Sequence, residues 1–174
     1  MWSFGVRALG KSVFVLFAMI GVIASIQQLG GQGAAPLTGA TINHIGFVTD
    51  DVEKARQAFI DNFGVTVPVP TEFGPLSVPK EVPGAAESRV RLTSFKMGTL
   101  TIELIQPLRG PGPHYEFLKS HGPGIQHIGF SVKSLEAAMA PLQKKGVKRP
   151  LRGYADFMPQ LGFMAEIQET PAPK

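Results

Sequence analysis

Two histidines and two glutamates stand at matching places in this chain, where they could together hold a metal ion. The segments INHIGFVTDDVEKA and IQHIGFSVKSLEAA share seven of fourteen positions, and His44 and His127 occupy the same place in this repeat. Glu103 and Glu166 lie later in each half, in TLTIELIQ and GFMAEIQE. Two imidazoles and two carboxylates that converge suit one divalent cation of intermediate hardness: Ni, Co, Mn, Fe or Zn.

Such a site predicts a particular chemistry. Four protein ligands in octahedral geometry leave two adjacent positions, where a small-molecule substrate could chelate through neighbouring oxygens. The metal would stabilise an enolate or enediolate, and a displaced carboxylate could act as the base. A single strand histidine is more often structural, but four matched positions in a duplicated frame favour a shared site. We therefore expect His44, Glu103, His127 and Glu166 to bind the metal, and Glu103 and Glu166 to be catalytic.

Strand alternation decides whether these side chains can meet, because successive residues of a strand point to opposite faces. In each repeated strand, the histidine shares a face with a small glycine, while isoleucine and phenylalanine share the other. Glu103 points away from its apolar neighbours Ile102 and Leu104, and Glu166 points away from Ala165 and Ile167 in the same way. The pattern therefore predicts that both histidines and both glutamates face one cleft.

The elements that must position these residues form two similar modules, about 41–107 and about 124–170. A repeat with two copies indicates duplication of a βα unit, whereas a solenoid needs three or more copies. The order βαβββ–βαβββ predicts an α+β fold in which two four-stranded sheets curl together around a shared cleft, and the Pro-rich stretch 67–83 predicts an irregular candidate lid. Beyond the repeated strands, the expected elements are helices to Phe63 and over 134–145, a hairpin turning at Gly98, a turn over 107–113, a short helix over 115–119 and strands over 147–153, 154–159 and 163–168.

Composition bounds the class of protein. With 174 residues, 44% hydrophobic and 17% charged, the chain suits one globular domain. It contains no cysteine, which excludes disulfides and thiolate chemistry. The net charge is +4 without a basic stripe, so we expect no nucleic-acid partner.

The N-terminal segment, residues 1–35, has the pattern of a secretory signal. Two basic residues precede the apolar run SVFVLFAMIGVIASI, and a small-residue exit follows. The alternatives are an uncleaved membrane anchor, since the run is close to the length that spans a bilayer, and a buried helix. We expect residues 36–174 to form the domain and to be exported, periplasmic or secreted, or anchored facing outside the cytoplasm. Membrane contact is then expected only through an uncleaved segment.

These motifs resemble the vicinal oxygen chelate superfamily, which includes glyoxalase I, methylmalonyl-CoA epimerase, extradiol dioxygenases and bleomycin-resistance proteins. The resemblance rests on INHIGFVTDD, TIELIQP, GIQHIGFSV and LGFMAEIQE and covers about residues 41–170. It implies the glyoxalase-like fold and a metal at the four positions named above. The run joining the halves looks like that of the epimerases, but basic or apolar residues around Arg91 occupy the place expected for an epimerase's second catalytic glutamate.

The resemblance implies a metal-dependent lyase or isomerase. A metal-free, resistance-type binding protein and an extradiol-type dioxygenase are the alternatives, and a homodimer is left open. Gln126, beside His127, is expected to face the helices and not to be a ligand, and His114 and His121 are expected to face solvent. The remaining polar candidates for contacting an anionic substrate or the cleft are Arg91, Arg109, Lys148, Arg152 and Tyr154.

Overall fold

The computed structural model describes residues 35–170. The predicted signal or anchor lies outside these residues, apart from Ala35. Within the described range, no helix combines the length and hydropathy needed to cross a membrane.

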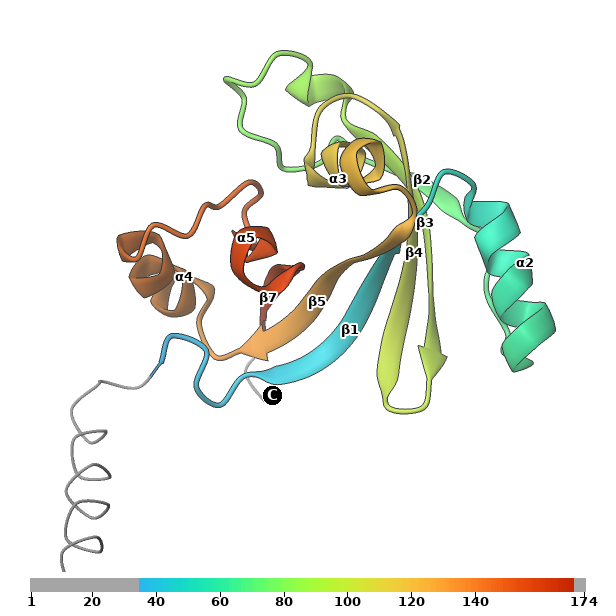
Figure 1. Ribbon diagram of the computed structural model, residues 1–174, viewed down its shortest axis with the longest axis horizontal. Coiled ribbons are helices and arrows are strands. Elements are labelled where there is room, and N and C mark those ends of the chain that lie inside the picture. Colours follow the sequence, from blue (N-terminus) through green and yellow to red (C-terminus); the bar gives the residue numbers. More distant parts are fainter. Residues whose placement is uncertain (1–34, 171–174) are drawn as a thin grey trace, which may run out of the picture. The chain divides into compact units, whose positions relative to one another are not determined.

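A single mixed sheet of seven strands forms the domain, in the order β2-β3-β4-β1-β5-β7-β6 (Figure 1). The repeated strands β1 and β5 are antiparallel neighbours at its centre, and each is parallel to the last strand of its own module, β4 or β7. The sheet therefore joins the two modules through the strands that carry the histidines. The elements are β1 (Thr41–Val48), α2 (Val52–Phe63), β2 (Thr71–Phe73), the 3-10 helix η1 (Ala85–Glu87), β3 (Arg89–Met97), β4 (Leu100–Arg109), α3 (Pro113–His121), β5 (Gly124–Val132), α4 (Leu135–Lys144), β6 (Tyr154–Asp156), α5 (Met158–Leu161) and β7 (Met164–Glu169).

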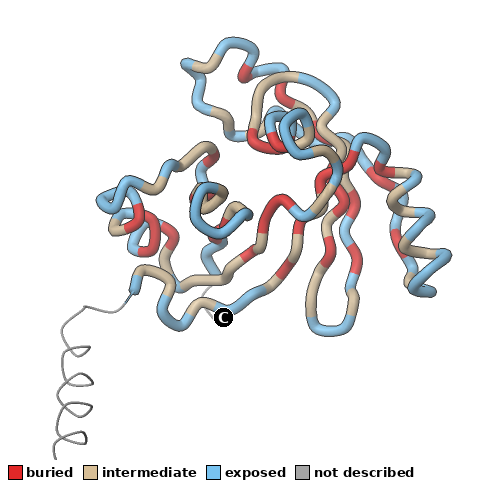
Figure 2. The backbone as a smooth tube through the Cα atoms, in the orientation of Figure 1, coloured by how far each residue is buried: buried red, intermediate tan, exposed pale blue. Residues whose placement is uncertain are grey.

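Helices α2 and α4 cover the apolar face that alternation predicted. Ile102 and Leu104 pack with Val52 of α2, and Ala165 and Ile167 pack with α4. Both helices begin at a side-chain cap, since Asp51 accepts a hydrogen bond from the Lys54 amide and Ser134 accepts one from the Ala137 amide. Figure 2 shows buried residues along the strands and in α4, whereas in α2 burial is limited to Val52 at its start. With this face filled, the histidines and glutamates are left on the opposite one.

The second module differs from the prediction by one strand. Residues 147–153, expected to be a strand, are irregular, and residues 154–159 give the short β6 followed by α5. Pro150 has no amide hydrogen for a ladder, and the Tyr154 amide bonds back to the Leu151 carbonyl in a turn. The second module is therefore βαββ, and one continuous seven-stranded sheet replaces the two four-stranded sheets that were expected.

β4 also runs further than predicted, to Arg109, although a turn was expected from Pro107. β1 pairs with β4 only as far as Ile105. Beyond that residue one side of β4 has no neighbouring strand, which is where a sheet tolerates proline.

Candidate metal centre

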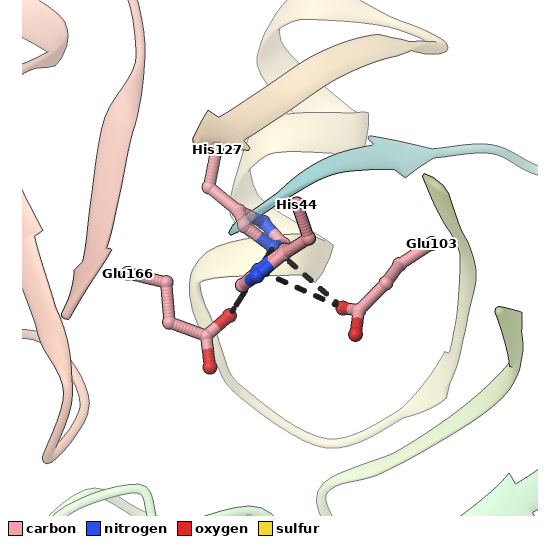
Figure 3. A group of neighbouring side chains, drawn as sticks. All are labelled: His44, Glu103, His127 and Glu166. Atoms are coloured by element: carbon pink, nitrogen blue, oxygen red, sulfur yellow. Dashed lines mark hydrogen bonds and ion pairs between the residues drawn. The ribbon is translucent and has the colours of Figure 1, made fainter. Parts of the chain in front are cut away.

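The four predicted side chains converge on one point (Figure 3). One ligand atom from each of His44, Glu103, His127 and Glu166 lies within 4.8 Å of all the others. The two Nε2 atoms are 3.2 Å apart, and Oε2 of Glu166 lies 3.1 and 3.2 Å from them. Oε2 of Glu103 lies 3.9 and 3.8 Å from the same two atoms. The sequence therefore predicted the cluster itself, and the role of its members as ligands and catalysts stays a prediction.

Strand register explains the convergence. Gly46 of β1 stands beside Glu103 of β4 on one side and His127 of β5 on the other. In the second row, Gly129 stands between His44 of β1 and Glu166 of β7. Each module therefore supplies one histidine and one glutamate, and the duplicated frame repeats the arrangement on both sides of the sheet's centre.

The two glycines make room for the imidazole rings. A Cβ added at Gly46 would lie 2.0 Å from the His127 ring, and a Cβ at Gly129 would lie 1.9 Å from the His44 ring. Real Cβ atoms essentially never come this close to another heavy atom. Each ring therefore lies over the bare backbone of the opposite strand, in space that any side chain at that glycine would fill.

An amide before each histidine orients its ring, and this feature was missed in the sequence. Asn43 Oδ1 lies 2.6 Å from Nδ1 of His44, and Gln126 Oε1 lies 2.7 Å from Nδ1 of His127. The Asn43 amide is itself oriented, because its Nδ2 donates to Ser131 and Gln168. Each Nδ1–H therefore donates to an amide oxygen, and each Nε2 turns a lone pair to the centre. The repeat carries the signal for this, an amide one residue before each histidine.

With the rings so oriented, the centre contains only acceptors. The two Nε2 lone pairs and Oε2 of Glu166 face one another at hydrogen-bond distance, which is favourable only if a proton or a metal cation lies between them. Burial alone would lower the pKa of His127, but the neighbouring carboxylates of Glu103 and Glu166 raise it above the ordinary value. Burial alone would raise the pKa of Glu166, yet its hydrogen bonds to His127 and His44 hold it well below the ordinary value. The donor set fits a divalent cation.

A cavity of about 280 Å³ opens beside the cluster and includes Glu103 and Glu166 in its wall. Tyr154 donates a 2.9 Å hydrogen bond to Oε2 of Glu166, so its expected place beside the cleft is confirmed. Among the basic candidates, Arg152 lines the cavity, whereas Arg91 pairs with Glu53 of α2. Most of the remaining wall is apolar and consists of Phe73, Pro75, Leu76, Val90, Leu92, Ile105 and Leu151.

The prediction that His114 faces solvent is wrong, whereas His121 is exposed as expected. His114 is 5% exposed, and its Nε2 lies 3.3 Å from the Tyr154 hydroxyl. Burial, followed by the nearby His127, lowers the pKa of His114 to about 4. The ring is buried because α3 packs against β4 and β5, a contact that the local sequence pattern does not reveal.

The profile of the Glyoxalase/Bleomycin resistance protein/Dioxygenase superfamily matches residues 43–157, more than half of the chain. Among curated proteins, the uncharacterized protein YqjC of Bacillus subtilis is 25% identical over 107 residues, 62% of this chain and 68% of that protein. The mitochondrial methylmalonyl-CoA epimerase of Bos taurus is 27% identical over 118 residues, 67% of this chain and 61% of the epimerase. The chain thus spans less than two thirds of the bovine relative.

Solved structures share the fold. A hypothetical protein from Bacillus halodurans C-125 superposes with a TM-score of 0.58 at 17% identity, covering 78% of this chain and 98% of that one. Methylmalonyl-CoA epimerase from Mycobacterium tuberculosis gives a TM-score of 0.52 at 22% identity, covering 83% and 95%. The predicted fold class is therefore confirmed by both sequence and structural similarity.

Proposed function

The chain belongs to the glyoxalase/bleomycin resistance protein/dioxygenase superfamily, and from this premise we propose that it is a divalent-metal-dependent isomerase or lyase. Its substrate would be a small molecule with a carbonyl and a neighbouring oxygen, and the reaction would move a proton at the carbon next to the carbonyl. The observation that carries the proposal is that two imidazoles, each able to bind a metal in its neutral form, and two carboxylates converge beside a cavity.

The cluster residues and the cavity wall would have different roles in this reaction. His44, His127, Glu103 and Glu166 would hold the cation, with Ni, Co, Mn, Fe and Zn all compatible with this donor set. The bound cation would supply Lewis-acid stabilisation of the negative charge that develops on the substrate oxygen. A cluster carboxylate would take the proton from carbon and return it. The largely apolar wall would lower the local dielectric and so strengthen each of these electrostatic interactions.

The epimerase relatives guide the choice of substrate to test. Bovine and human methylmalonyl-CoA epimerases are similar to this chain, and one solved epimerase is in complex with methylmalonyl-CoA. The cleft side of β3 carries Val90 and Leu92 on the cavity wall, and the Arg91 side chain is engaged with Glu53. Glu103 and Glu166 supply the carboxylates among the described residues that line the cavity, so we assign the base to the cluster.

The experiment measures metal content and proton exchange on the full-length chain. The protein is reconstituted separately with the five metals and assayed in D2O by NMR, with methylmalonyl-CoA and small α-hydroxy carbonyl compounds as probes. We expect one metal per chain and metal-dependent exchange of the α-hydrogen. The double variant His44→Ala/His127→Ala should lose both while keeping the circular dichroism spectrum of the wild type.

Two outcomes would redirect the assignment. A wild-type chain that takes up no metal after reconstitution contradicts the enzyme proposal and leaves the cavity as a ligand-binding pocket, the metal-free alternative. Consumption of O2 with catechols by the Fe(II)-loaded protein, without α-hydrogen exchange, would favour dioxygenase chemistry instead.

A further inference from the structure

The two glutamates of the cluster, equivalent by duplication, have different surroundings. Glu166 accepts hydrogen bonds from Tyr154 at 2.9 Å on Oε2 and from Gln168 at 3.1 Å on Oε1. Among residues 35–170, Glu103 has only the longer contacts of 3.8 and 3.9 Å with the two histidines. Among the described residues, one carboxylate therefore accepts hydrogen bonds at both oxygens, and the other, beside the cavity, accepts none.

The difference comes from the neighbouring outer strands. In the β6–β7 register Tyr154 stands opposite Glu166, and in the β3–β4 register Ser94 stands opposite Glu103. The tyrosine hydroxyl reaches its glutamate, while the shorter Ser94, which is exposed, makes no hydrogen bond to Glu103 in the described part of the chain. Among the described residues, therefore, only the second module has an outer-strand side chain that hydrogen-bonds to the cluster glutamate opposite it.

His114 supports this hydrogen bond from behind. Ionised Glu166 can only accept, so the single hydroxyl hydrogen of Tyr154 is donated to it. The Tyr154 oxygen is then free to accept from His114, whose Nε2 lies 3.3 Å away. His114 must therefore carry its hydrogen on Nε2, which gives a hydrogen-bond chain with one direction, from His114 through Tyr154 to Glu166.

From these contacts we propose that Tyr154, supported by His114, is a positioning residue that fixes Glu166 as an anchored ligand and leaves Glu103 as the carboxylate that exchanges the substrate proton. The inference rests on the proposed function. In the step, the C–H bond next to the carbonyl breaks and its electron pair forms a C=C bond to the carbonyl carbon, while the C=O π pair moves to the oxygen and the proton bonds to a Glu103 oxygen. The reverse transfer returns a proton to carbon, so no other reactant is needed.

The test separates metal affinity from exchange at saturating metal, in two matched pairs of variants. Tyr154→Phe and Ser94→Ala each remove one hydroxyl opposite a cluster glutamate. We expect Tyr154→Phe to weaken metal binding by about 10-fold or more, the scale for loss of a partner that orients a ligand, and Ser94→Ala to leave it unchanged. Equal affinity in these two variants would overturn the anchoring role.

The second pair assigns the base. Glu103→Gln should bind metal and lose about 100-fold or more of the exchange rate at saturation, the scale for general base catalysis. Glu166→Gln should need more metal yet retain exchange once loaded. The opposite pattern would make Glu166 the base and overturn the assignment.

A third measurement keeps this inference separable from the proposed function. In metal-free wild-type protein labelled with ¹⁵N-histidine, NMR should show His114 as the Nε2–H tautomer, and an Nδ1–H tautomer would contradict the direction of the chain. If the wild type shows neither metal nor exchange, the proposed function fails and the base assignment falls with it. The anchoring of Glu166 by Tyr154 and His114 is then tested only by the tautomer of His114.

Discussion

Replacing Gly46 with alanine tests whether the bare backbone beneath His127 is what admits its ring. The new Cβ would start 2.0 Å from the ring, whereas ordinary van der Waals contact begins at about 3.4 Å. The ring or the strand must therefore shift by more than an ångström, although His127 is completely buried. Overpacking of this kind costs about 1–3 kcal/mol of unfolding free energy.

Two assays measure the consequence. In metal-free protein, the overpacking should lower the melting temperature by about 2–4 °C per kcal/mol, as for domains of roughly this size. Metal affinity should fall by about 10–100-fold, the scale for loss of a ligand's orientation, because a ligand displaced by an ångström no longer meets the other three. Gly129→Ala should behave like Gly46→Ala, since its Cβ would lie 1.9 Å from the His44 ring.

The matched control is Gly124→Ala, on the same strand as His127. A Cβ there would come no closer than 3.9 Å to the Phe117 ring, so neither stability nor metal affinity should fall. Wild-type melting temperature and affinity in Gly46→Ala would refute the argument that these glycines shape the site. A loss of the same size in Gly124→Ala would show that glycine in the strand, and not clearance for the ring, is what matters.

Three further predictions concern protons and orientation. Burial lowers the pKa of His114 from 6.5 to about 4 in the metal-free fold, so the unfolded chain takes up this proton at a higher pH than the folded one does. The free energy of unfolding should therefore be highest above pH 6.5 and fall by up to about 1.4 kcal/mol per pH unit as the pH is lowered toward 4. Urea titrations across this range should show a weaker pH dependence in His114→Phe. Asn43→Leu should weaken metal binding about 10–100-fold in chelator competition, because the His44 ring loses the acceptor for its Nδ1–H. Metal affinity should also fall as the pH is lowered, and calorimetry in two buffers should detect proton release, because the metal displaces the proton favoured by the raised pKa of His127.

The cluster could be predicted from sequence because its geometry follows from two short-range rules. Alternation gives the face of each strand residue, and duplication places an equivalent residue in the other module. Neither rule needs a knowledge of long-range contacts. The glycines were noted as small neighbours of the histidines, but their cross-strand pairing became visible only when the β1–β5 register fixed Gly46 opposite His127.

The other features that the sequence did not predict depend largely on contacts between distant segments. His114 lies on an amphipathic helix whose burial is decided by packing against β4 and β5, 40 residues before the tyrosine that it contacts. Gln126 was set aside as a ligand because alternation places it on the helix side, although an amide can act through the ring that it orients. The expected strand at 147–153 fails at Pro150, where local β propensity could not outweigh the missing amide hydrogen.

The order of the strands separates two tasks within the fold. The four inner strands, β4-β1-β5-β7, supply the four cluster residues. The outer strands supply much of the cavity wall, with Phe73 from β2, Leu92 from β3 and Tyr154 from β6. The repeat that is visible in the sequence belongs to inner strands, and the outer strands differ between the modules. Substitutions on the outer strands can therefore alter the cavity wall, or the contacts of one glutamate, without moving the backbone that brings the metal-binding candidates together. The unequal surroundings of Glu103 and Glu166 arise at these outer positions.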